Sequence, residues 1–156
     1  MAPADIRAAL KAHPFLEGLP EKHIDTLAAM AFEASFEARQ IIFRESDPSS
    51  FFYLILSGTV ALEITTPGRL FRIQTIGEGE ELGWSSLLAK VNKQFQARSL
   101  EPVRAFAFDG ARLRGTCDEN PEFGYLISRK VLEVVAERLS ATRLQLLDVY
   151  ANKGGD

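Results

Sequence analysis

The sequence is poor in the residue types that build metal centres and hydrolytic active sites. It contains one cysteine, Cys117, and two separated histidines, His13 and His23. A single thiol excludes an internal disulfide and a cysteine-rich zinc site, so we expect no metal and interpret Cys117 as a buried or idle thiol. No Ser-His-Asp arrangement and no carboxylate pair facing a nucleophile can be read from the chain. We therefore expect no catalytic residues and a protein that is not an enzyme.

The chain also lacks a basic excess and a long apolar run. Its 18 Lys and Arg residues stand against 21 Asp and Glu, which gives a formal net charge of -3. This charge balance does not favour binding to nucleic acid, and the six residues after Tyr150 are too few for a helix-turn-helix. We therefore expect that nucleic acid is not a partner. The N-terminus "MAPADIRAAL" lacks the apolar run of a signal peptide, and no segment is long enough to cross a bilayer. These features predict a cytoplasmic protein without membrane contact.

The residues that are abundant predict one mainly β domain over residues 1–156, since 46% of the chain is hydrophobic. Helical spacing predicts two short helices over residues 4–16 and 21–32. From residue 34 to about 109 the pattern changes to short β-prone runs separated by turns. We expect an antiparallel β jelly-roll barrel, flanked by the N-terminal helices and a long C-terminal helix. The runs are "SFEARQIIFR", "FFYLILSG", "TVALEIT", "LFRIQTI", "QFQARSL" and "VRAFAFD".

The last helix is predicted over about 119–150, with Asp118 or Asn120 as its cap and Pro121 in its first turn. One apolar stripe follows coiled-coil spacing and consists of Leu132, Val135, Leu139, Thr142, Leu146 and Val149. A second stripe, suited to lie on the barrel, consists of Phe123, Ile127, Val131 and Val134. The first stripe predicts a homodimer through this helix. One wide stripe packed on its own domain is the alternative.

In this order of elements, and in three segments, the chain resembles the cyclic nucleotide-binding domain family. The segments are "HPFLEGLPEKHIDTLA", "IIFRESDPSSFFYLILSGTVALEI" and "SLEPVRAFAFD". Family members that bind a cyclic nucleotide carry Gly-Asp-x-x-Gly-Glu-x-Ala-Leu, followed later by Pro-Arg-Ala-Ala. In that loop, the resemblance implies, a short helix N-terminus and an Arg hold the cyclic phosphate, while a Glu accepts from the ribose hydroxyl.

The corresponding loop here, "GEELGWSSLL", departs from this form at both polar anchors. Aligned on Gly79 and Gly83, Trp84 takes the place of the ribose Glu and Lys93 that of the phosphate Arg. Lys keeps the charge but loses the bidentate geometry of Arg. An alternative register aligns "ELG" with Glu-Leu-Gly and makes Glu81 the ribose ligand. The residues that the resemblance implies for ligand binding are Gly83, Trp84, Ser85, Ser86, Lys93 and Gln94.

Two functions remain open at the sequence level. The first is a sensory or regulatory module that binds a cyclic nucleotide, cAMP or cGMP, or another small anion in this loop, with no cofactor and with a regulatory protein as a possible partner. The second is a ligand-free interaction or dimerisation domain with a vestigial pocket. The role of Trp84 differs between these two functions. In a ligand-free domain its indole plugs the pocket or packs in the core, whereas in a sensory module it stacks on the ligand.

Overall fold

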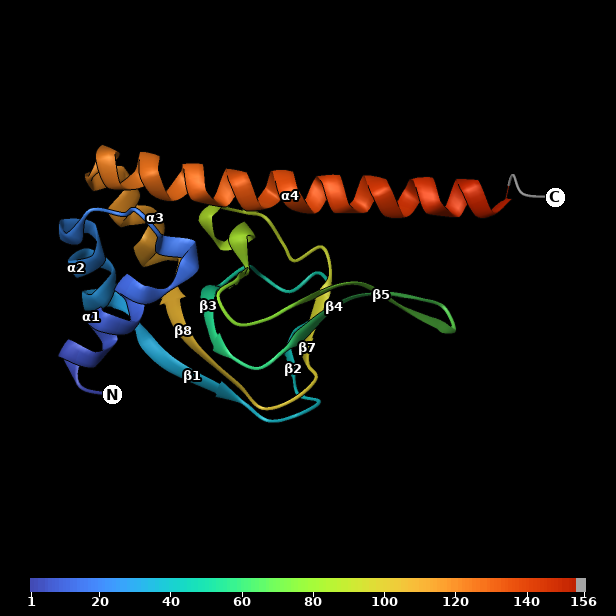
Figure 1. The fold of residues 1–156 in the computed structure, drawn as a ribbon, viewed down its shortest axis with the longest axis horizontal. Coiled ribbons are helices and arrows are strands. Elements are labelled where there is room, and N and C mark those ends of the chain that lie inside the picture. The colour runs from blue at the N-terminus through green and yellow to red at the C-terminus, as the bar shows by residue number, and fades with distance from the viewer. Residues whose placement is uncertain (154–156) are drawn as a thin grey trace.

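The computed structural model describes residues 1–153, and the last three residues of the predicted domain lie outside this range. The chain begins with three short helical segments, follows with the strands and ends in two helices (Figure 1). The helical segments are α1 (Pro3–Ala12), η1 (Pro14–Leu16), α2 (Glu21–Met30), η2 (Trp84–Leu87), α3 (Gly110–Glu119) and α4 (Pro121–Lys153). The strands are β1 (Phe32–Phe36), β2 (Ile41–Phe43), β3 (Phe51–Ser57), β4 (Val60–Thr66), β5 (Arg69–Ile76), β6 (Glu81–Leu82), β7 (Gln96–Ser99) and β8 (Val103–Asp109). The predicted mainly β fold class is confirmed.

The strands pair into two antiparallel sheets. Within residues 1–153 the first sheet has the order β1-β8-β3-β6 and the second the order β2-β7-β4-β5. Gly58 makes the turn between β3 and β4 with a φ of 94°, and a Cβ on it would lie 2.4 Å from the Pro102 carbonyl oxygen. Only glycine fits there, because both the backbone conformation and the close approach exclude a side chain.

Two predicted elements proved to be divided. The run predicted as one strand over residues 35–44 forms β1 and β2, which belong to different sheets. The chain changes sheet at Arg39, which has a φ of 65°. The helix predicted over residues 4–16 ends at Ala12, because Pro14 cannot continue it and starts η1 instead.

The C-terminal part contains one helix more than predicted. Asp109 caps α3 by accepting a hydrogen bond from the Arg112 N–H at 2.9 Å. Asn120, one of the two predicted caps, ends α3 and accepts from the Phe123 N–H at 3.3 Å at the start of α4. The structure therefore begins the long helix at Pro121 and continues it to Lys153, close to the predicted bounds.

The buried side chains form two clusters. One lies beneath the helices and includes Leu54 and Phe108 together with Phe123, Ile127 and Val131 of α4. This confirms the barrel-facing stripe that the sequence predicted for the long helix. The other cluster fills the interior between the sheets, with Ile55, Val60, Leu62, Ile76 and Leu82 among its members.

Helix α4 continues well beyond the part that packs on the domain, with its C-terminal end far from the N-terminal helices (Figure 1). From Thr142 to Lys153 every residue of the helix is exposed. In this part the Gln145 amide donates a hydrogen bond to the Ile73 carbonyl of β5 at 2.9 Å. In residues 1–153 no helix is apolar enough over its length to span a membrane.

Candidate functional site

The site lies where β6 leads through Gly83 into η2, a segment (residues 79–88) that we call the cassette. Gly83 has a φ of 87° and is the N-cap of η2. The Ser86 N–H donates to the Gly83 carbonyl at 3.0 Å, and the Ser86 carbonyl accepts from the Arg114 guanidinium of α3 at 2.6 Å. Both ends of η2 are thus fixed, and the left-handed Gly83 agrees with the alignment that matches it to the second family glycine.

The structure brings three of the predicted ligand-binding residues together, namely Gly83, Ser85 and Lys93. Ser86 is fully buried against Gly110, and its N–H is already used within η2. Gln94 is exposed and its side-chain amide donates to the Asn92 carbonyl at 3.2 Å, so it lies apart from the group.

Trp84 is half-buried and packs against the cluster beneath the helices. It is not among the residues that pack on the cluster between the sheets. Of the roles considered for this indole, its position agrees best with packing in the core beneath the helices.

Lys93 is the central charge of the site. Its side chain is only 5% exposed, with Nζ 3.4 Å from the Ser85 hydroxyl and 4.3 Å from the centroid of the Phe43 ring. A Cβ added to Gly83 would lie 3.0 Å from the same Nζ. Burial lowers the pKa of Lys93 to about 8, and the Glu81 carboxylate partly opposes that shift. An ammonium has three donors, and the hydroxyl contact uses one of them at long range.

An ion pair that the sequence did not predict joins the cassette to α4. Glu81 is 1% exposed, and the Arg138 guanidinium Nη2 lies 2.5 Å from its Oε1 and donates to its backbone carbonyl at 2.8 Å. Burial raises the pKa of Glu81 to about 7, although Arg138 and then Lys93 pull it down. Arg138 lies four residues after Val134 and so extends the barrel-facing stripe, which was the signal available in the sequence.

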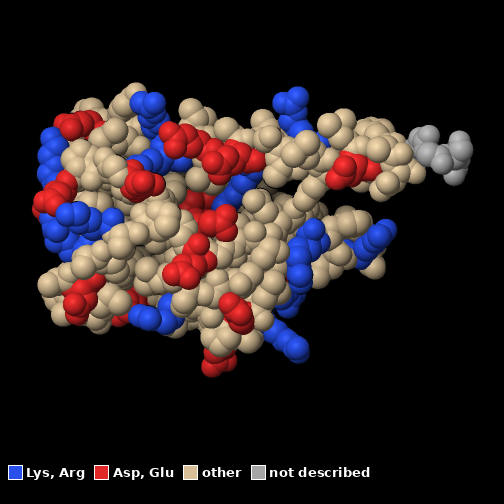
Figure 2. Space-filling view, in the orientation of Figure 1, with Lys and Arg blue, Asp and Glu red and all other residues tan. Residues whose placement is uncertain are grey.

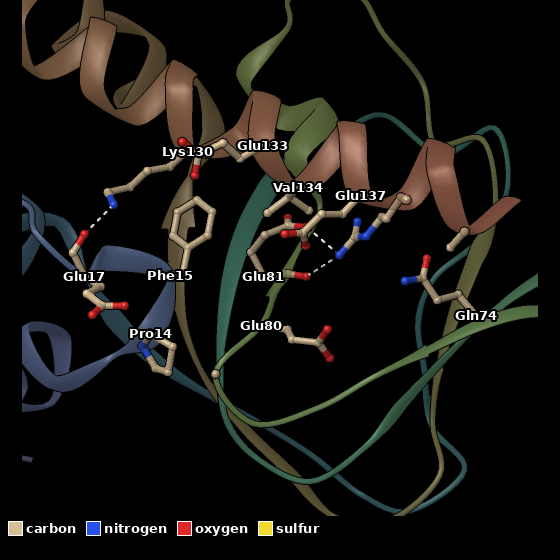
Figure 3. A pocket seen from close by; sticks show the side chains of 13 residues that line it. Pro14, Phe15, Glu17, Gln74, Glu80, Glu81, Lys130, Glu133, Val134 and Glu137 are labelled. Carbon is tan, nitrogen blue, oxygen red and sulfur yellow. Dashed lines mark hydrogen bonds and ion pairs between the residues drawn. The ribbon is translucent and has the colours of Figure 1, made fainter. Parts of the chain in front are cut away.

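Beside this ion pair a cavity of about 640 Å³ separates α4 from the barrel (Figure 3). Carboxylates dominate the charged side chains that line it: Glu17, Glu80, Glu81, Glu133 and Glu137 against Lys130 and Arg138. Acidic side chains gather along the edge of α4 above this hollow (Figure 2). Within residues 1–153 no cluster of three or more such groups is placed to hold a metal ion. The cavity therefore disfavours an anion, and Lys93 does not line it.

The chain belongs to the cyclic nucleotide-binding domain family, whose model matches residues 33–120. The match spans most of the strands, the cassette and α3. The recognised resemblance is thereby confirmed.

One sequence relative and two solved structures show how similar this chain is to known proteins. A CRP-like cAMP-activated global transcriptional regulator from Mycobacterium tuberculosis is 28% identical over 134 residues, which cover 85% of this chain and 58% of that protein. A Geobacter metallireducens GS-15 protein named for cyclic nucleotide binding has a TM-score of 0.75 and 27% identity, with 89% of this chain and 98% of that one covered. A cyclic nucleotide-binding domain from Methylobacillus flagellatus KT has a TM-score of 0.78, with 94% of this chain and 83% of that one covered. Its identity of 16% supports the fold alone.

Proposed function

We propose that the protein is a non-enzymatic sensory or regulatory module that binds a small anion at Lys93 and forms a homodimer through α4. The observation that carries the proposal is the ammonium of Lys93, which is buried in the cassette of a cyclic nucleotide-binding fold with most of its hydrogen-bonding capacity unused. A buried charge of this kind is costly without an anionic partner, so it suits a site that is completed by its ligand.

A cyclic nucleotide, cAMP or cGMP, is the first ligand to test, because the mycobacterial relative is named as cAMP-activated. Two features weaken the fit. Trp84 stands where the family form has the ribose Glu, and the carboxylates beneath α4 repel a phosphate that enters from that side. We therefore expect micromolar or weaker binding if a cyclic nucleotide is the ligand.

Titration of Trp84 fluorescence with cAMP and cGMP, with thermal denaturation as a second readout, tests the anion site. Trp84 is the only tryptophan and adjoins Ser85, which contacts Lys93. We expect a saturable change that Lys93→Glu abolishes, because the substitution reverses the charge at the anchor. Lys90→Glu is the matched control, since Lys90 is exposed in the same loop, and should leave the response intact. If neither nucleotide has an effect at millimolar concentration on folded protein, a cyclic nucleotide is not the ligand.

The second candidate is a ligand-free interaction domain that acts on a regulatory protein partner. It is favoured by the core packing of Trp84 and by the position of the Lys93 ammonium, which lies directly against Gly83 and Ser85. In this case Lys93 fills the site itself, and Lys93→Glu would change stability without changing any response to small anions.

Dimerisation through α4 is supported by the exposure of the predicted seam. Leu132, Leu139, Leu146 and Val149 are 67%, 59%, 54% and 52% exposed. Val135, another member of the predicted seam, is half-buried and packs on the cluster beneath the helices. An unpaired row of such side chains on a projecting helix suits a second copy of the same helix. We expect the full chain to sediment as a dimer.

Replacing Leu139 and Leu146 together by Lys should raise the dimer dissociation constant by at least about 100-fold, because two buried leucines per helix and their pairing are lost. Leu144→Lys with Leu147→Lys is the matched control: both side chains are 62% exposed but lie off the seam. Equal weakening by both pairs, measured by sedimentation equilibrium, would argue against the seam as the interface.

A further inference from the structure

A second cavity reaches Lys93 from the side away from the acidic lining of α4. Its volume is about 240 Å³, and it lies between β2, the loop before β3 and the start of β3. Phe43, Phe51, Tyr53 and Lys93 are among the side chains that line it. None of these four lines the cavity beneath α4, so the two hollows are separate.

Two polar side chains in this cavity are more than nine-tenths buried, and both can donate. The first is Lys93, whose ammonium lies against the Phe43 ring and makes one long contact with Ser85. The second is Tyr53, which is 9% exposed; its hydroxyl is not among the fully buried polar atoms that lack a partner in residues 1–153, so it keeps access to solvent. A hydroxyl that keeps such access can donate to an acceptor on a ligand that enters the cavity.

The rest of the lining is mainly apolar and aromatic. Phe51 and Tyr53 lie with their ring centroids 6.2 Å apart, and Phe36 packs edge-on to Tyr53 at 5.7 Å. Phe51 is 36% exposed, so the rings extend to the surface. The Asp47 carboxylate also lines the cavity, but it already accepts a hydrogen bond from the Arg44 N–H at 2.9 Å. An aromatic ring can pair with these side chains at offset or edge-on angles.

The size of the cavity limits the ligand further. A volume of 240 Å³ corresponds to roughly eight water molecules at about 30 Å³ each, below the range of about 300 Å³ upward that is typical of drug-sized ligands. One ring with one acidic group fits this space, whereas a base, a ribose and a phosphate together need more.

From the paired donors, the aromatic lining and the volume, we infer that this cavity binds a small monocyclic aromatic carboxylate, with one carboxylate oxygen on Lys93 and the other on the Tyr53 hydroxyl. The inference rests on the proposed function, since it assigns a ligand class to the same anchor, Lys93. It places the ligand in the cavity beside β2 and β3, which Lys93 lines, and not in the cavity beneath α4, which Lys93 does not line.

Calorimetric titration of the full chain with benzoate tests the inference. We expect saturable binding with a dissociation constant of about 1 mM or tighter, and no saturation with benzyl alcohol or acetate, which lack the charge or the ring. Lys93→Met should abolish benzoate binding. Tyr53→Phe removes one hydrogen bond to a charged group and should weaken binding by about 10-fold or more, with the fold unchanged by circular dichroism. Lys90→Met should have no effect.

The outcomes separate this inference from the proposed function. If benzoate does not bind at about 10 mM to folded protein while cAMP or cGMP binds in a Lys93-dependent manner, the inference is wrong and the anion site stands. Benzoate binding that survives both Lys93→Met and Tyr53→Phe also overturns it, because the ligand then lies elsewhere. If neither benzoate nor a nucleotide binds, both proposals fail.

Should Lys93→Met not fold, Tyr53→Phe alone decides. Loss of the hydroxyl must then weaken the binding of benzoate and leave the binding of a nucleotide unaffected.

Discussion

Replacing Arg138 by Met should destabilise the protein by about 3 kcal/mol, because the substitution leaves the Glu81 carboxylate buried without its cation. Glu81 is 1% exposed, so water cannot take the place of the guanidinium without opening the cassette. This loss lies at the lower end of the range for buried ion pairs that lose one partner, because Glu81 can take up a proton and so lose its charge. Arg143→Met is the matched control on an exposed position of the same helix and should change stability by less than about 0.5 kcal/mol. Urea unfolding of the three proteins at pH 7.5 measures the difference.

The loss at Arg138 should also depend on pH. The folded-state pKa of Glu81 is raised from 4.5 to about 7, so the folded protein binds more protons than the unfolded chain between these values. Stability from this group is therefore present below pH 4.5 and is lost as the pH rises through 7. Removing Arg138 raises the pKa of Glu81 further, so the variant should recover part of its deficit at pH 5. A deficit that stays constant from pH 5 to 7.5 would mean that the carboxylate is not the cause.

The double variant Glu81→Met with Arg138→Met separates the loss of a pair from the loss of packing. Apolar side chains of similar volume often replace a buried ion pair at little cost. We expect the double variant to be more stable than Arg138→Met alone. Such a result would assign the ion pair to positioning the cassette against α4, not to net stabilisation of the fold.

The second large effect is expected for Gly83→Ala. The new Cβ would lie 2.6 Å from the Phe51 carbonyl oxygen and 3.0 Å from Lys93 Nζ, on a residue with a φ of 87°. Backbone strain and overpacking together should cost about 3 kcal/mol, and the ammonium of Lys93 should be displaced. Any anion response of the protein should therefore fall with the stability.

Gly68→Ala is a control for the backbone term of that prediction. Gly68 has a φ of 74°, but nothing lies within 4 Å of the position of its Cβ. It should cost about 1 to 2 kcal/mol, the penalty for a left-handed alanine without a clash. Equal losses at both positions in thermal unfolding would show that the contacts around Gly83 yield easily and that the site is less rigid than its geometry implies.

The architecture could be predicted from the sequence wherever one local pattern decided it. The apolar alternation of Tyr53, Ile55, Val60 and Leu62 and the left-handed turn at Gly58 are local features, and the structure contains them as expected. The division into β1 and β2 was missed, because the run over residues 35–44 was interpreted as one β-prone segment. Helix α3 was missed because its residues carry little amphipathic pattern, and it is held mainly by the Asp109 cap and contacts from other elements.

The site was predicted less completely than the fold. Lys93 was found because the resemblance aligns it with a charged anchor, and the structure buries it there. Arg138 lies 57 residues from Glu81, and no single-sequence pattern connects them. Gln94 was included with Lys93, but it lies in a bend before β7, where its side chain is exposed and donates to the Asn92 carbonyl. Contacts between segments that are distant in the sequence thus decide which residues of a motif belong to the site.

The free edge of β5 affects how copies of the chain can associate. This strand ends its sheet, and its first four residues are exposed, so its free backbone groups could pair with a strand of another molecule. Arg69 and Arg72 place positive charge along that border, and the Gln145 amide already occupies the Ile73 carbonyl. Both features oppose strand addition and fibre growth. Strand β5 is thereby protected against the addition of another strand, while the leucines of α4 stay exposed to solvent.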